Sequence, residues 1–295
     1  MRRIGIVGAG QMGHGIAQTA AQSGFDVVLN DVQSAALERG LKSIDKQLGR
    51  LVEKGKLEKD AAAAARGRIS AAPELRALEA CDLVIEAATE QTALKFRLFE
   101  ELTKATPKDT ILASNTSSIS ITAIAARTDR PDRVMGMHFM NPVPVMQLVE
   151  LVRGLATSDA TFGAVSEVAR AMGKTVVVGR DMPGFIVNRV LMPYVNEAVF
   201  ALYEGIASRE DIDTAMKLGT NVPMGPLALA DFIGLDTCLA ILEVLQTGLG
   251  DDKYRPCPLL RKYVEAGWLG RKTGRGFYTY EGDRVAGLPS GRGLG

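Results

Sequence analysis

The chain has 295 residues, of which 46% are hydrophobic and 23% charged, a balance typical of folded globular proteins and not of disordered or fibrous ones. Lys and Arg number 35 against 34 Asp and Glu, so the net charge of +1 argues against nucleic acid as a partner. A chain of this length favours two domains.

The three cysteines, Cys81, Cys238 and Cys257, are far apart and show no metal-ligand spacing. They predict neither a disulfide framework nor a metal site. No apolar run approaches the roughly 20 residues of a membrane helix, and the first residues lead directly into a strand without an apolar signal region. We therefore expect a cytoplasmic protein with no membrane partner.

The first part of the chain alternates strands with helices. An apolar strand at 4–7 precedes a glycine-rich turn, and residues 16–21 then have helical spacing. Further strands are expected at 25–30, 81–88, 110–113, 134–139, 146–152 and 174–179. This alternation predicts an α/β domain with a doubly wound, parallel sheet.

About fifty residues separate the second of these strands from the third, too many for one crossover helix. Leu41, Ile44, Leu48 and Leu51 form an apolar stripe there. On the adjoining face, basic residues recur every four positions at Lys42, Lys46, Arg50 and Lys54. With the alanine-rich stretch 59–66, this pattern predicts an inserted helical hairpin at about 36–68.

Asp181-Met182-Pro183-Gly184 marks a boundary, because Pro and Gly together interrupt regular structure. Beyond it, residues 185–203, 209–218, 227–249 and 259–266 are expected to be helical. The sequence therefore predicts a first domain at 1–183 and an all-α second domain at 184–295.

The glycine-rich turn has the spacing of a dinucleotide-binding motif. Gly8, Gly10 and Gly13 follow a strand and open a helix, and Asp31 ends the next strand 21 residues after Gly10. Glycines allow a pyrophosphate to approach the helix N-terminus closely. Asp31 is expected to accept hydrogen bonds from the adenosine ribose hydroxyls and to repel a 2′-phosphate. The pattern therefore predicts NAD as the cofactor in preference to NADP.

Only two histidines are available as an acid or base near neutral pH. His14 lies in the glycine-rich turn, where a packing role is favoured. His138 ends a predicted strand, and Glu150 lies in an apolar stretch of the next one. A carboxylate among apolar neighbours needs a partner, and a Glu beside a His makes the ring a better base. A lone strand histidine with a structural role is the alternative.

Small polar residues cluster at 114–118, where a predicted strand ends. Doubly wound folds bind ligands at this edge of the sheet, although a helix cap would explain one such residue.

These segments together closely resemble the L-3-hydroxyacyl-CoA dehydrogenase family, whose short bacterial members are 3-hydroxybutyryl-CoA dehydrogenases. The resemblance runs over about residues 3–281 through GIVGAGQMGHGIA, ASNTSSISIT, GMHFMNPVPVMQLVE, DMPGFIVNR, AMKLGTNVPMGPLALAD and RKTGRGFYTY. It implies a Rossmann-type first domain, an acyl-CoA substrate oxidised at its 3-hydroxyl group by NAD, and a homodimer formed through the second domain.

The resemblance also implies roles for individual residues. His138 would be the base and Glu150 its partner, while Asn188 would hold the substrate and Ser117 would contact the reacting oxygen. The implied cofactor contacts are Gly8, Ala9, Gly10, Gln11, Met12, Gly13, Asp31, Glu90, Lys95, Asn115, Ser117 and Lys272. The implied contacts to the coenzyme A substrate are Lys54, Arg50, Lys56, Ser117 and Asn141.

Two alternative functions remain open. A β-hydroxyacid dehydrogenase acting on a free acid also joins such a domain to a helical one, but it typically carries a lysine where Arg189 follows Asn188 here. A non-catalytic NAD-binding protein is the second alternative, against which the presence of His138 and Glu150 argues.

Overall fold

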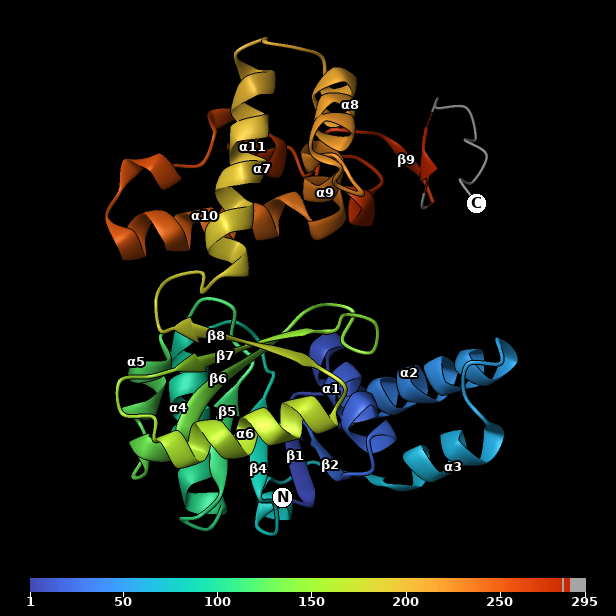
Figure 1. Ribbon diagram of the computed structural model, residues 1–295, viewed down its shortest axis with the longest axis vertical. Coiled ribbons are helices and arrows are strands. Elements are labelled where there is room, and N and C mark those ends of the chain that lie inside the picture. Colours follow the sequence, from blue (N-terminus) through green and yellow to red (C-terminus); the bar gives the residue numbers. More distant parts are fainter. Residues whose placement is uncertain (283, 287–295) are drawn as a thin grey trace. The chain divides into compact units, whose positions relative to one another are not determined.

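The computed structural model describes residues 1–282 and 284–286, and they form two compact units, of which the first is Met1–Phe185 and the second begins at Ile186 (Figure 1). Residues 287–295, at the end of the predicted second domain, lie outside the described residues. No helix among the described residues is both long enough and apolar enough to cross a bilayer.

One eight-stranded sheet organises the first unit. Its spatial order is β3-β2-β1-β4-β5-β6-β7-β8, and every neighbouring pair is parallel except β6 and β7. The strands are β1 (Arg3–Val7), β2 (Asp26–Asn30), β3 (Ile69–Ala72), β4 (Leu83–Glu86), β5 (Ile111–Ser114), β6 (Val134–Phe139), β7 (Leu148–Arg153) and β8 (Thr175–Arg180).

Helices cover both faces of this sheet. Successive side chains of a strand point to opposite faces, so Ile85 of β4 packs in one core cluster and Val84 in another. The first cluster includes α1 (Gln11–Gln22), α2 (Ser34–Glu53) and α6 (Asp159–Ala171), and the second includes α4 (Thr92–Ala105) and α5 (Ile121–Ala125). This three-layer arrangement confirms the predicted Rossmann-type fold.

The inserted segment forms the expected pair of helices, α2 and α3 (Lys59–Gly67), joined through Gly55 at a φ of +63°. Both helices pack against α1 (Figure 1). The sequence prediction omitted β3, which follows α3 and pairs with β2 at the edge of the sheet. The omission has a physical reason, because two of its four residues, Ser70 and Ala71, are exposed and give no apolar run.

The second unit is helical, as predicted from the sequence. It contains α7 (Val187–Tyr203), α8 (Arg209–Thr220), α9 (Pro226–Ile233), α10 (Leu235–Leu249) and α11 (Pro258–Glu265) around one apolar core. The single helix expected at 227–249 is wrong, because Gly234 at a φ of +104° separates α9 from α10. A small antiparallel pair of strands, β9 (Tyr280–Glu281) and β10 (Arg284–Val285), was also not expected.

Candidate active site

The glycine-rich turn connects β1 to α1 at the carboxyl edge of the parallel strands. Gly8 has a φ of +99°, and a Cβ atom at Gly13 would lie 1.7 Å from the carbonyl oxygen of Gly8. Both positions therefore require glycine for the turn to close on the helix. Gly10 differs, because a Cβ there would meet nothing within 4 Å and would project into open space.

The first turn of α1 has no side-chain cap, so its N–H groups are available to an anion in that open space. Asp31, directly after β2, borders the glycine-rich turn between β1 and α1. Its Oδ2 accepts from the Ala9 N–H at 2.9 Å, and its Oδ1 accepts from the Gln33 N–H at 3.0 Å. A pyrophosphate cradle beside a ribose-binding carboxylate suits NAD. Of the other predicted residues, Ala9 lies in the glycine-rich turn, and Gln11 and Met12 begin α1.

A network of charged residues connects the ends of β4 and β5. Glu86, the last residue of β4, is fully buried and lies opposite Ser114 of β5. Its Oε2 accepts from the Ser114 hydroxyl at 2.7 Å, and its Oε1 accepts from the Ala88 N–H at 2.7 Å. Lys95 of α4 is 1% exposed, and its ammonium lies 2.7 and 3.0 Å from the two oxygens of Glu86.

Glu90 organises the polar turn that follows β5. Its Oε1 accepts from the Thr116 hydroxyl at 2.5 Å, from the Ser117 N–H at 2.9 Å and from the Ser118 hydroxyl at 3.1 Å. Its Oε2 lies 3.3 Å from the Lys95 ammonium. Burial alone would raise the pKa of Glu90, but the charge of Lys95 and these hydrogen bonds outweigh it and hold that pKa below its usual value.

His138 and Glu150 occupy opposite positions on the antiparallel strands β6 and β7. The His138 Nδ1 is 2.6 Å from the Glu150 Oε2, and Glu150 is fully buried while His138 is 7% exposed. A carboxylate bonded to Nδ1 fixes the orientation and tautomer of the ring and leaves Nε2 to face a reactant. The structure thus brings together the two residues that the sequence placed on neighbouring strands.

Three further contacts lie at the histidine, at the residue after it and in the turn that follows β6. The Phe185 ring lies edge-on to it, with the ring centroids 5.8 Å apart, and Phe185 adopts a φ of +48°, rare for a bulky residue. The Asn115 Oδ1 accepts from the Phe139 N–H at 2.9 Å, which links the polar turn to the residue after His138. The Asn141 Oδ1 accepts from the Gln11 side chain at 3.1 Å, so the turn after β6 contacts α1.

The remaining predicted residues lie outside this cluster. Arg50, Lys54 and Lys56 are exposed on the α2–α3 hairpin, and none of them has an ion-pair partner among the described residues. In the second unit, Asn188 is in the first turn of α7. Lys272, also in that unit, is exposed and bound to Asp236 at 2.5 and 2.7 Å.

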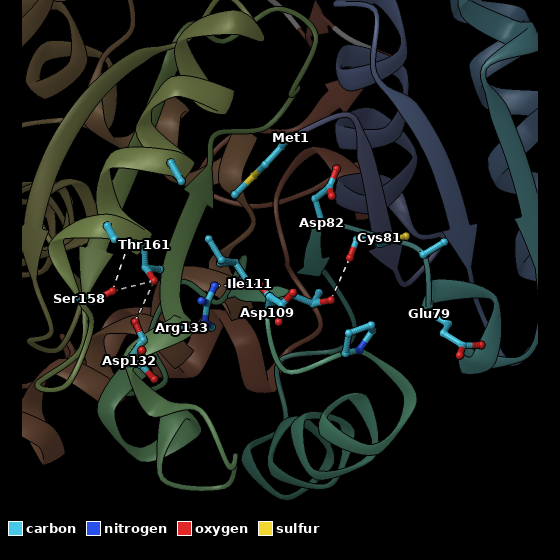
Figure 2. Close-up of a pocket in the computed structure, with 15 residues that line it drawn as sticks. Met1, Glu79, Cys81, Asp82, Asp109, Ile111, Asp132, Arg133, Ser158 and Thr161 are labelled. Atoms are coloured by element: carbon cyan, nitrogen blue, oxygen red, sulfur yellow. Dashed lines mark hydrogen bonds between the residues drawn. The ribbon is translucent and has the colours of Figure 1, made fainter.

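A hollow of about 770 Å³ opens at the opposite edge of the sheet, where β4, β5 and β6 begin (Figure 2). Its lining includes Asp82, Asp109 and Arg133, but none of the residues predicted for the site. The candidate active site is therefore at the carboxyl edge, and the hollow has no share in it.

The sequence analysis missed Glu86, although a signal for it was present. Within the apolar stretch at 81–88, Glu86 follows three consecutive apolar residues, 83–85, which is the same signal that identified Glu150.

Comparison with known proteins matches both units to one family. Residues 3–182 match the 3-hydroxyacyl-CoA dehydrogenase NAD binding domain, and residues 184–280 match the C-terminal domain of the same family. A 3-hydroxybutyryl-CoA dehydrogenase of Bradyrhizobium diazoefficiens is 58% identical over 282 residues, 96% of each chain. A probable 3-hydroxybutyryl-CoA dehydrogenase of Bacillus subtilis is 60% identical over 95% of this chain and 98% of its own.

A solved structure agrees with these matches. The crystal structure of (S)-3-hydroxybutyryl-CoA dehydrogenase from Ralstonia eutropha superimposes with a TM-score of 0.93 at 53% identity, covering 95% of this chain and 99% of that one.

Proposed function

Since this chain belongs to the 3-hydroxyacyl-CoA dehydrogenase family, we propose that it interconverts an (S)-3-hydroxyacyl-CoA and the 3-oxoacyl-CoA with NAD(H), and that its substrate is 3-hydroxybutyryl-CoA. The first unit binds the cofactor, and residues of the hairpin and of the second unit bind the acyl-CoA.

The observation that carries this proposal is the 2.6 Å contact between His138 and Glu150. With Nδ1 bound to a buried carboxylate, the lone pair of the neutral ring lies on Nε2, so that this nitrogen can accept the proton of the 3-hydroxyl group. The negative charge of Glu150 then stabilises the imidazolium that forms. In the reductive direction the same nitrogen returns the proton to the carbonyl oxygen.

NAD, when bound, would accept the hydride from the carbon that carries the 3-hydroxyl group. The N-terminus of α1 binds its pyrophosphate, and Asp31 binds the adenosine ribose. Asn115, Ser117 and Glu90 border the end of β5, where the Ser117 hydroxyl, which donates to the Glu90 Oε1 at 3.3 Å in the free protein, would turn to donate to the reacting oxygen. A donor at that atom stabilises the charge that develops as the proton is transferred.

The other predicted residues hold the two ligands. Asn188 holds the reacting part of the substrate, Asn141 contacts its coenzyme A part, and Lys54, with Arg50 and Lys56, attracts the phosphates of coenzyme A. Lys272 contributes to the cofactor site, whereas Lys95, also predicted as a cofactor contact, is 1% exposed and acts on that site through Glu90. The second unit also forms a homodimer, for which light scattering should give twice the mass of the chain; the mass of a single chain would contradict it.

The function is tested by incubating the purified protein with acetoacetyl-CoA and following the loss of NADH or NADPH absorbance. We expect consumption of NADH and not of NADPH, and none with free acetoacetate. His138→Ala should retain NADH binding while kcat falls by roughly 100- to 10,000-fold, the usual share of a general base.

Each alternative function has its own outcome in this experiment. Turnover of free acetoacetate would indicate a β-hydroxyacid enzyme. Binding of NADH without turnover of either substrate would indicate a non-catalytic protein. A His138→Ala variant with the wild-type rate would contradict the assignment of the base.

A further inference from the structure

We propose that Glu86 is a positioning residue: with Lys95 it fixes the carboxylate of Glu90, which in turn orders the turn at 115–119 that presents Ser117. This inference rests on the proposed function only for the role of Ser117, since the ordering of the turn is independent of the reaction.

The first step is the position of Glu86. Its carboxylate is fully buried and accepts hydrogen bonds from Lys95, Ser114 and Ala88 within 3.0 Å. Its carbonyl oxygen also accepts from the Asn115 N–H at 2.7 Å. One residue thus fixes both the last residue of β5 and the first residue of the turn.

The second step is the chemistry of Lys95. Its ammonium has three protons, and its neighbours are the two oxygens of Glu86, the Ala88 carbonyl at 3.2 Å and Glu90 at 3.3 Å. At 1% exposure it cannot turn outward to a ligand. The cation therefore acts through Glu90, whose second oxygen it holds.

The third step is the dependence of the turn on these groups. The amides of residues 115–119 all donate to an acceptor in the network or in the turn itself. Glu90 supplies the charged acceptor for three consecutive residues, Thr116, Ser117 and Ser118. Displacement of this carboxylate removes the partner of Ser117 at both its N–H and its hydroxyl group.

A buried ion pair is weak evidence for stability, because an uncharged pair of similar shape is often as stable. This permits an experiment that separates stability from positioning. Glu86→Gln alone removes the nearer of the two carboxylates that face the buried Lys95 and should lower Tm by on the order of 10 °C. The double variant Glu86→Gln/Lys95→Met removes both charges, keeps an acceptor for Ala88 and should recover most of that loss.

Despite its recovered Tm, the double variant should have a kcat about tenfold or more below wild type, since small displacements in a site are costly. The acid limb of its pH–kcat profile should move to higher pH, because Glu90 has lost the cation that lowers its pKa. Without any ligand, amide hydrogen exchange at 114–120 should be faster, while the rest of the unit is unchanged.

Arg130→Met is the matched control. Arg130 is also a buried cation of the first unit, 4% exposed, but it binds carbonyl oxygens of Thr103, Thr106 and Pro107 near the opposite edge of the sheet. The Arg130→Met variant should have a lower Tm than wild type, with an unchanged pH–kcat profile and unchanged amide hydrogen exchange at 114–120.

Recovery of kcat, pH profile and exchange together with Tm in the double variant would overturn the inference and leave the pair a merely structural one. Should that variant not fold, Glu86→Asp retains the charge but shortens the side chain, and unchanged exchange at 114–120 would overturn the inference equally. If wild type failed to reduce acetoacetyl-CoA while exchange responded as expected, the proposed function would fail and the ordering of the turn would stand.

Discussion

At the scale of single residues, the chemistry depends on a carboxylate that is buried beside one imidazole. Glu150 is twelve positions from His138 in the sequence, yet the antiparallel pairing of their strands places them directly opposite each other. Phe185 shields the ring from one side. The ring therefore has an apolar neighbour beside the buried anion, and low polarity strengthens the attraction between the anion and a protonated ring.

Glu150→Gln should keep the shape of this contact but remove its charge. We expect kcat with acetoacetyl-CoA and NADH to fall by about 100-fold or more, because the imidazolium loses its counter-ion and the ring loses its preferred tautomer. Steady-state kinetics measure this effect. The fluorescence of NADH on binding to the variant serves as a control for an intact cofactor site. A rate within about twofold of wild type would show that the charge is unimportant.

At the scale of elements, the turn between β1 and α1 uses its glycines for two different physical reasons. Gly13 has no room for a side chain, since the Gly8 carbonyl oxygen occupies the place of its Cβ. Gly10 has an ordinary φ of −66° and open space beside it. Gly13 is therefore needed for folding, and Gly10 for binding the ligand.

Gly10→Ala and Gly13→Ala should therefore separate the two properties. Gly10→Ala should leave Tm nearly unchanged but weaken NADH binding by about tenfold or more, because the added methyl group lies where the pyrophosphate approaches. Gly13→Ala should destabilise the fold by about 2 kcal/mol or more through the backbone clash. Calorimetry and NADH titration test both, and equal losses of Tm in the two variants would refute the distinction.

The α2–α3 hairpin is the other element to which we assign a ligand. Its apolar side packs on α1, and its basic side chains at Arg50, Lys54 and Lys56 remain exposed. Exposed charges attract phosphates weakly and with a strong dependence on salt.

Lys54→Ala should raise the KM for acetoacetyl-CoA by roughly two- to fivefold, the effect of one exposed charge pair, with kcat unchanged. The KM for acetoacetyl-N-acetylcysteamine, a thioester without phosphates, should not change. Lys42→Ala is the matched control on the same helix. An equal effect of Lys54→Ala on both thioesters would contradict a phosphate contact.

At the scale of the whole molecule, the three cysteines are divided between two separate cores. Cys81 belongs to the first unit and Cys238 and Cys257 to the second, with exposures of 3%, 0% and 0%. Burial raises the pKa of Cys81 to about 11 and that of Cys238 to about 12, and it also raises the pKa of Cys257. Burial thus favours the neutral thiol at all three positions.

Because the thiolate is the reactive form, native protein should not react with Ellman's reagent over an hour at pH 8. Unfolding in guanidinium chloride should expose all three thiols to immediate titration. Prompt labelling of the native protein would mean that one of the two cores opens locally.

Features that depend on neighbours in the chain could be predicted from the amino-acid sequence. The alternation of apolar strands and helices predicted the Rossmann-type sheet and the helical second domain, and the glycine spacing before α1 predicted the cofactor. Local backbone exceptions were missed. Gly234 looked like one more helical residue, and only its φ of +104°, with Lys272 packed against it, shows that the helix stops there.

The tertiary structure was needed to show which side chains meet. Glu86, Lys95 and Ser114 belong to β4, α4 and β5, which follow one another in the chain, but the register of the strands and the packing of α4 bring their polar atoms together. No periodicity records such a contact. The same apolar surroundings suggested a partner for Glu150 because a histidine lies on the preceding strand, whereas the partner of Glu86 lies on the helix that follows. Burial of a charge can be predicted from local pattern, but its counter-ion is set by the packing of whole elements.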